Sequence, residues 1–118
     1  MGNRSFEDLI VWQKSLDLVQ EIYILTDSFP EKEKFGLVSQ MRRSAVSIPS
    51  NIAEGSKRGS RKDFSHFLKI DAGSAAELYT QIIISRRLFN INSKKSEMLL
   101  NEIQKMLSVL ISRNVKSI

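Results

Sequence analysis

The sequence predicts an all-α fold, an antiparallel up-down-up-down four-helix bundle. Apolar residues recur at three- and four-residue steps in four long segments, and no segment alternates apolar with polar residues as a half-buried strand does. The 118 residues include five glycines and two prolines, too few for an all-β domain with a turn about every ten residues. The links between the periodic segments are short, which favours antiparallel neighbours. This length predicts a single domain over residues 1–118.

The first helix is expected from Phe6 to Ser28. Ser5 is suited to cap it, with Asp8 three residues later, and the Ser28-Phe29-Pro30 segment ends it. Its apolar stripe comprises Val11, Trp12, Ser15, Leu16, Val19, Ile22 and Tyr23.

The second helix is expected from a start within residues 31–37 to about Glu54. Pro49 removes a backbone hydrogen bond inside it, so we expect one helix kinked near Pro49, or a break there as the alternative. Gly55 suits a left-handed C-terminal cap. One apolar face continues across the proline, formed by Leu37, Met41, Ala45, Ile48 and Ile52.

The third helix is expected from Ser60 to about Phe89, with Ser60 and Asp63 as a capping pair. Residues 90–93 form the turn, and a fourth helix follows over about 93–114. The buried side of the third helix is marked by Phe64, Phe67, Leu68, Ala72, Ala75, Leu78, Tyr79, Ile82 and Ile83. The fourth carries Leu99, Ile103, Met106, Leu107 and Leu110 at coiled-coil spacing.

Composition excludes several classes of site. With no cysteine and one histidine, the chain has no disulfide, no thiolate nucleophile and no multi-histidine metal site. A catalytic triad around His66 is not expected, and the Glu-x-x-His repeats of di-metal bundles are absent, so we predict neither an enzyme nor a metal or other cofactor. The segments lack a membrane-length apolar run and the start lacks an apolar signal core, which places the protein in the cytoplasm.

Positive charge concentrates in the middle of the chain. The net charge is +5, and residues 41–62 alone hold six basic side chains and one acidic side chain. Such a cluster indicates either a solvated surface or a polyanionic partner, usually nucleic acid.

The second helix also has an unusual polar stripe, in which serine and asparagine take the place of better helix formers. The stripe contains Gln40, Arg43, Ser47, Ser50, Asn51 and Glu54. We expect a polar network or interface made by Arg43, Ser47, Asn51, Glu54 and Glu77, buried and paired within the chain or against a neighbouring subunit. The alternative is a polar binding groove.

Several motifs carry a family resemblance. They are Phe6-x-x-Leu9-x-Val11-Trp12, the segment from Phe29 to Leu37, the long block from Gln40 to Gly55 and Gly73-Ser74-x-x-Glu77. Together they resemble the four-helix-bundle family encoded within intervening sequences of bacterial large-subunit ribosomal RNA genes. Asp71 departs from this pattern, because the family usually has Ala there.

The resemblance implies a non-enzymatic homo-oligomer, typically a pentameric ring. The fold is similar to that of the accessory variability protein of diversity-generating retroelements, a basic ring that binds nucleic acid and a reverse transcriptase. It therefore implies RNA or DNA, and a nucleic-acid-processing protein, as partners. Apolar residues outside the helical stripes add weak support for oligomer contacts: Ile10, Leu18, Ile24, Ile70 and Ile84.

The basic residues that we expect to contact phosphate are clustered between the second and third helices. They are Lys57, Arg58, Arg61 and Lys62, with Arg42, Arg86 and Arg87 as secondary candidates. A helix N-terminus beside the cluster favours anions. Two functions remain open: a nucleic-acid-binding accessory protein, or a protein-protein interaction scaffold with no nucleic-acid role.

Overall fold

The computed structural model describes the backbone of residues 5–117 and the side chains of residues 5–113. Its four long helices are α1 (Ile10–Asp27), α2 (Leu37–Lys57), α3 (Arg61–Phe89) and α4 (Lys94–Ser117), with short 3-10 turns η1 (Phe6–Asp8) and η2 (Glu31–Glu33). No strand occurs in the described residues, so the predicted all-helical bundle is confirmed. Within the same residues, no helix is long and apolar enough to span a bilayer.

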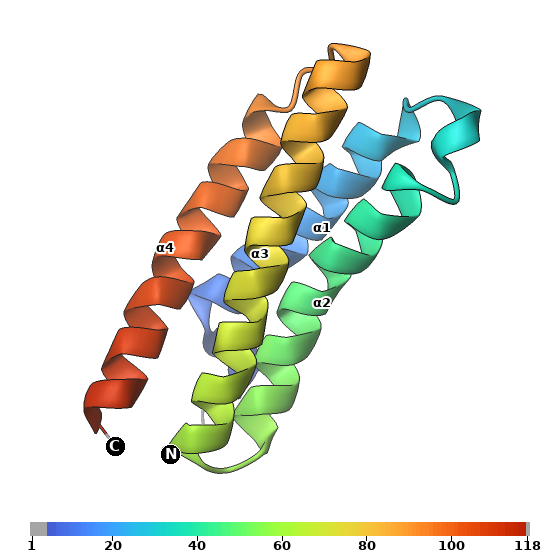
Figure 1. Cartoon of the computed structure of the whole chain (residues 1–118). Helices are drawn as coiled ribbons and strands as arrows, with labels where there is room; N and C mark the ends of the chain where they lie inside the picture. The colour runs from blue at the N-terminus through green and yellow to red at the C-terminus, as the bar shows by residue number, and fades with distance from the viewer. Residues whose placement is uncertain (1–4, 118) are drawn as a thin grey trace.

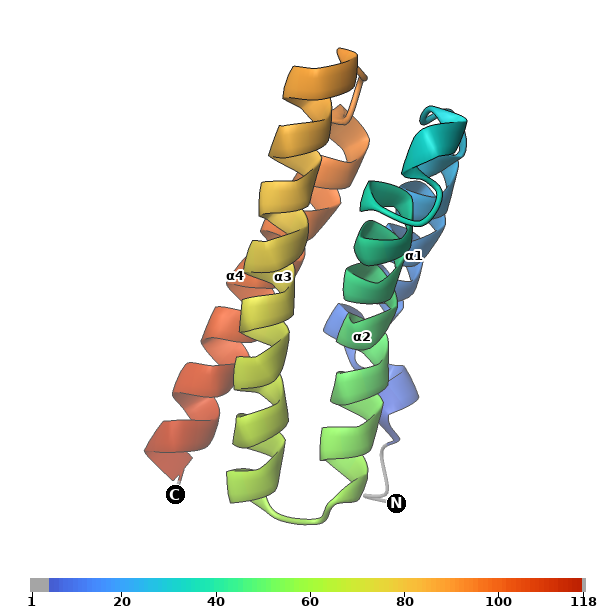
Figure 2. The same ribbon diagram turned by 45° about the vertical axis from the view of Figure 1, so that its right-hand side comes forward.

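The helices form a closed bundle in which each contacts two neighbours. α2 packs between α1 and α3, and α4 packs against both α1 and α3. Figure 1 shows the α2–α3 link at one end of the bundle and the α1–α2 and α3–α4 links at the other. A second view shows the same arrangement, with the α2–α3 link as a short loop at its end (Figure 2). The bundle measures 47 × 23 × 22 Å, so the two ends are well separated.

The core is built from the apolar stripes that the sequence indicates. Met41, Ala45, Ile48 and Ile52 of α2 are completely buried, as predicted for one continuous face. Leu18 is also completely buried, so its assignment as a spare surface residue was wrong. It lies one helical turn from Ile22 and Ser15, and these three residues share the buried face of α1 with Val11 and Thr26.

Two helix boundaries differ from expectation. Ser5 caps η1 rather than α1, because its Oγ accepts the N–H of Glu7 at 3.0 Å, and the extended backbone of Leu9 then separates η1 from α1. α2 runs without interruption through Pro49 to Lys57. A kink at Pro49 stays a prediction.

Gly55 is not the left-handed cap that was expected. It lies inside α2 and is buried against α3, where an added Cβ would stand 2.7 Å from the Cβ of Phe67. The left-handed position in this link is Gly59, whose φ of +90° reverses the chain before Ser60 caps α3. The glycine at 55 therefore serves the close approach of two helices.

This contact predicts opposite effects for two helical glycines. Gly55→Ala should lower the free energy of unfolding by about 1–3 kcal/mol, because overpacking against the fixed Phe67 Cβ outweighs the gain in helix propensity. Gly73→Ala, in the interior of α3 with nothing within 4 Å of the added Cβ, should raise it by about 0.5–1 kcal/mol. Urea unfolding of both variants measures this, and equal stabilisation by the two alanines would contradict the close packing at Gly55.

Candidate nucleic-acid interface

The end of the bundle at the α2–α3 link carries the predicted basic cluster. Lys57 closes α2, and Arg61 and Lys62 open α3, with Arg58 and the left-handed Gly59 between them. All four cationic side chains are exposed. The structure thus brings together the four primary residues that sequence reasoning proposed for phosphate contact. We call this cluster of Lys57, Arg58, Arg61 and Lys62 the basic end.

Charge at the basic end is only partly neutralised. Arg58 Nη2 lies 2.8 Å from Glu54 Oε2, and the guanidinium stacks 5.0 Å from the centre of the Phe67 ring. Lys57 and Lys62 make no ion pair with any residue that the structure describes. Ser60 Oγ accepts the N–H of Asp63 at 3.1 Å, which orders the first turn of α3 beside them. The end keeps a positive field in contact with solvent.

Arg42, a secondary candidate, has a different place. Its Nε donates to Thr26 Oγ1 at 2.9 Å, and its guanidinium lies 4.3 Å from the centre of the Tyr23 ring on α1. Asp27 lies 3.9 Å from its Nη2. These contacts tie α2 to α1, and they leave little of Arg42 available for a phosphate.

Two of the basic residues at the opposite end are paired with carboxylates. Arg86 Nη1 lies 2.7 Å from Glu97 Oε2, and Lys95 Nζ lies 3.1 Å from Glu21 Oε2. The hydrogen bond from Ser93, followed by the bond and charge of Arg86, lowers the pKa of Glu97 below its ordinary value. Arg87 is exposed on α3. Arg86 and Lys95 are thus matched by carboxylates, whereas Arg87 and Lys94 make no ion pair within the described residues.

The predicted polar network of α2 is not buried within one chain. Arg43, Glu54 and Glu77 are exposed, so for them the expected burial inside a single chain was wrong. Ser44 Oγ reaches Glu77 Oε1 at 3.4 Å, and Ser47 Oγ donates to its own helix backbone at 2.7 Å. Pairing of Arg43 and Glu77 with a neighbouring subunit stays a prediction.

A polar contact between α2 and α3 joins Asn51 to Asp71. Asn51 Nδ2 donates to Asp71 Oδ1 at 3.0 Å, and the Asp71 side chain is completely buried. Its other oxygen, Oδ2, has no hydrogen-bond partner among the described residues. Burial raises the pKa of Asp71 to about 7, against the opposing effect of the bond from Asn51. The sequence could have indicated this pair through Asp71 itself, which is a polar residue at a position of α3 whose helical spacing places it on the buried face.

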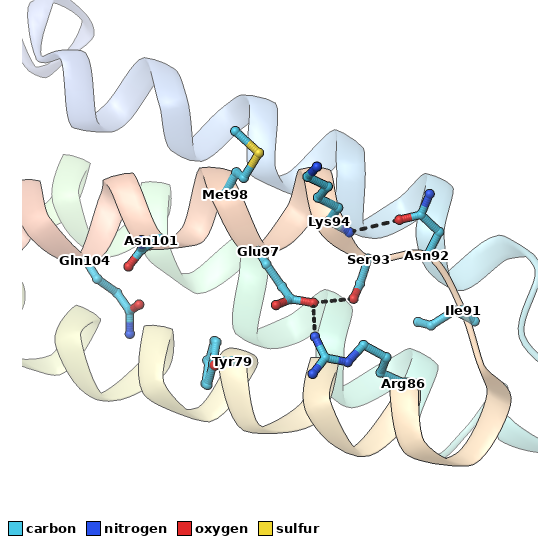
Figure 3. A pocket seen from close by; sticks show the side chains of 10 residues that line it. All are labelled: Tyr79, Arg86, Ile91, Asn92, Ser93, Lys94, Glu97, Met98, Asn101 and Gln104. Carbon is cyan, nitrogen blue, oxygen red and sulfur yellow. Dashed lines mark hydrogen bonds and ion pairs between the residues drawn. The ribbon is translucent and has the colours of Figure 1, made fainter.

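A second groove lies between α3 and α4, and sequence reasoning did not find it. It has a volume of about 620 Å³. Figure 3 shows Tyr79 rising from α3 and Gln104 descending from α4 into the space between them, with the Arg86–Glu97–Ser93 cluster further along. The lining residues are Tyr79, Arg86, Ile91, Asn92, Ser93, Lys94, Glu97, Met98, Asn101 and Gln104. Tyr79 was expected on the buried side of its helix and is 45% exposed.

No group of three or more histidine, aspartate or glutamate side chains within the described part of the chain is placed to hold a metal ion. Glu54, a member of the predicted polar network, is bound to Arg58.

The fold and its charged surface define a small helical bundle with one strongly basic end. The chain belongs to the 23S rRNA-intervening sequence protein family, whose model matches residues 7–112. It is similar to a protein of unknown function from the S23 ribosomal protein family of Bacteroides thetaiotaomicron VPI-5482, with 31% identity and a TM-score of 0.77. That match covers 90% of this chain and 98% of the other. No curated protein matches the sequence.

The buried carboxyl predicts an inverse pH dependence of stability. Because the pKa of Asp71 rises to about 7 on folding, the folded chain binds more protons than the unfolded chain between about pH 4 and pH 7, and stability falls as pH rises through that window. Asp71→Asn keeps the acceptor for Asn51 and cannot ionise. We expect it to exceed wild type by about 2–4 kcal/mol at about pH 8 and to match it near pH 4.

Denaturant unfolding across this pH range is the measurement. Asp17→Asn, which removes an exposed carboxyl from α1, is the control and should change stability little at any pH. A stability difference between Asp71→Asn and wild type that stays constant with pH would contradict the assignment.

The adjacent arginines Arg42 and Arg43 should respond differently to alanine. Arg42→Ala removes the bond to Thr26 and the stacking on Tyr23 and should cost about 2 kcal/mol. Arg43→Ala removes an exposed side chain and should change the stability of a single chain by less than about 0.5 kcal/mol. Thermal melts at low protein concentration compare the two. A large loss for Arg43→Ala, accompanied by dissociation into single chains, would place Arg43 in an interface between subunits.

Proposed function

We propose that this protein is a non-enzymatic, homo-oligomeric bundle of the cytoplasm that binds RNA or DNA through the phosphate backbone. The observation that carries the proposal is the basic end. There, four exposed cations within six residues stand against two nearby carboxylates, Glu54 and Asp63. The N-terminus of α3 adds the positive end of its dipole to the same surface.

The contacts proposed here are sequence-tolerant. Lys57 and Lys62 are flexible point charges without an ion-pair partner in the described residues, a form that suits phosphate but does not read base edges. Among the described residues no aromatic ring lies against either lysine, whereas the Phe67 ring is covered by Arg58. Family membership fits this proposal, because the family is named for intervening sequences of 23S rRNA and the resemblance of the sequence motifs implies a ring that binds nucleic acid.

Oligomerisation would multiply the field of the basic end. We propose a ring, most simply a pentamer as the family resemblance implies. Exposed apolar side chains on α1 and α3 are available for contact between copies: Ile10, Ile24, Ile70 and Ile84 are between 42% and 66% exposed.

Light scattering tests the assembly. We expect a mass near five times the 13.5 kDa of one chain. A strictly monomeric mass at tens of micromolar protein would remove the ring from the proposal, and a dimeric mass would replace it.

The salt dependence of binding tests the proposed contacts. Each neutralised phosphate contributes about −0.9 to the slope of log affinity against log salt for duplex DNA, and about −0.7 for a single strand. Lys57→Ala combined with Arg58→Ala should therefore make the slope shallower by about one to two units and leave the fold intact, because both side chains are exposed. Gel shifts or anisotropy at several salt concentrations measure this.

The matched control is Lys32→Ala combined with Lys34→Ala. These lysines lie at or beside η2, at the other end of the bundle, and they carry the same total charge. An equal loss of slope in both double variants would show that net charge alone matters. An unchanged slope in the Lys57/Arg58 variant would make the basic end a solvated loop.

A protein-protein interaction scaffold is the second candidate. It is favoured by Phe35, which is 89% exposed beside η2, and by an apolar groove of about 440 Å³ between α1 and α4. The groove is lined mainly by Leu9, Ile10, Met106, Val109 and Leu110. Absence of RNA and DNA binding by the wild-type protein at low salt would favour this function over the first.

A further inference from the structure

The groove between α3 and α4 offers chemistry that the basic end lacks. Tyr79 presents an aromatic ring to it and is 45% exposed, and Asn101 and Gln104 present side-chain amides from α4. Neither amide, nor the Tyr79 hydroxyl, makes a hydrogen bond with the residues that the structure describes. The groove therefore combines an aromatic ring with three polar groups that are available to form hydrogen bonds with a ligand.

The remaining lining supplies charge at one end. Lys94 begins α4 and is exposed, with its backbone N–H bonded to Asn92 Oδ1 at 3.2 Å. Arg86 neutralises Glu97 at 2.7 Å, so the carboxylate adds little repulsion toward an anion. Lys94 lines the groove where α4 begins, and Figure 3 shows the paired Arg86 and Glu97 below it, with the Lys94 ammonium group turned to the side of α4 away from Tyr79.

The dimensions suit a nucleotide chain. A volume of about 620 Å³ is within the range of about 300–1,000 Å³ that small-molecule sites occupy. Seven residues of α3 separate Arg86 from Tyr79, which corresponds to about 10 Å along the helix. That is the length of about three stacked nucleotides at about 3.4 Å each.

We propose that the α3–α4 groove binds the base of an unpaired nucleotide, stacked on Tyr79 and hydrogen-bonded by Asn101 and Gln104, with its strand passing Lys94. Side-chain amides offer a donor and an acceptor together, the pattern that matches the N6 and N7 edge of adenine. Unpaired uracil and cytosine also present a donor beside an acceptor, so the expected preference for adenine comes from the larger purine ring stacked on Tyr79. This inference rests on the proposed nucleic-acid function and adds to it a base-contacting site on a surface separate from the basic end.

The two surfaces make different demands on a ligand. The basic end neutralises phosphate and is sensitive to salt, whereas stacking and amide contacts release few counterions. Changes in the groove should alter affinity and base preference with little effect on the salt slope. Changes at Lys57 and Arg58 should do the reverse.

The test uses the full-length protein and fluorescence anisotropy with oligoadenylate, oligouridylate and oligocytidylate of equal length at fixed salt. Tyr79→Leu should weaken oligoadenylate binding about 10-fold, whereas Tyr79→Phe, which keeps the ring, should stay within about 2-fold of wild type. Asn101→Ala combined with Gln104→Ala should weaken binding of all three oligomers by a similar factor, because each base offers a donor and an acceptor to an amide. Because these side chains are at least partly exposed, melting temperatures should remain close to wild type in every variant.

The outcomes separate this site from the proposed function. Binding with a normal salt slope that is unaffected by Tyr79→Leu overturns the groove and leaves the basic end in place. Equal loss in Tyr79→Leu and Tyr79→Phe overturns stacking. Adenosine monophosphate that binds as tightly as oligoadenylate, and only when Tyr79 is present, overturns the strand and assigns the site to a free nucleotide. Absence of binding to every oligomer at low salt overturns both proposals together.

Discussion

The close contact of α2 with α3 at Gly55 positions much of the rest of the molecule. An ordinary side chain there would collide with the Cβ of Phe67, which belongs to the backbone frame of α3 and cannot turn aside. The two helices can therefore approach at their connected end, and a short link containing Gly59 is enough to join them. This geometry places the last residue of α2 beside the first turn of α3. The basic end is thus a direct consequence of a packing constraint, although its residues make no contribution to the core.

The same helix pair contains the main departure from an apolar interior. Asn51 and Asp71 meet midway along α2 and α3, and the carboxyl has one partner for its two oxygens. Burial of an unpaired charge is costly, so the molecule reduces the cost by holding the carboxyl near neutrality, as the raised pKa indicates. An alanine at this position would avoid that cost. With Asp71 in its place, a hydrogen bond from Asn51 fixes the register of α2 against α3. The same buried carboxyl makes the stability of the fold depend on pH.

The sequence was sufficient for the helices and most of the core because helical periodicity reports burial directly. The faces of α2 and α4 could be read in this way, and the Ser60–Asp63 cap and the Asn90 turn were found where expected. The prediction left Leu18 outside the core because it centred the apolar stripe on Trp12 and Leu16. The buried face of α1 is rotated from that stripe and runs through Ser15, Leu18 and Ile22. Small polar residues such as Ser15 obscure a face when they are buried at a close helix contact.

The charged groups were harder to predict, because their roles depend on which helices face one another. Arg42 and Arg43 are adjacent in sequence, yet only Arg42 points to α1 and finds Thr26 and Tyr23 there. Likewise, the groove between α3 and α4 is lined by Tyr79 and Gln104, which are 25 positions apart in the sequence. They become neighbours only because α3 and α4 pack against each other. Composition and spacing identify such residues as basic, aromatic or amide, but not as neighbours.

The distribution of paired charge gives the bundle two chemically distinct ends. At the end with the α1–α2 and α3–α4 links, carboxylates meet the cations of three helices: Asp27 with Arg42, Glu97 with Arg86, and Glu21 with Lys95. At the basic end, Glu54 meets Arg58, while Lys57 and Lys62 face solvent without an ion-pair partner in the described structure. Exposed pairs such as these add little to stability, so their main effect is on the field around the molecule. The net charge of +5 is therefore spread over both ends: within the described residues, Lys57 and Lys62 are unpaired at the basic end, and Arg87 and Lys94 are exposed without an ion pair at the other, beside the groove that holds Tyr79.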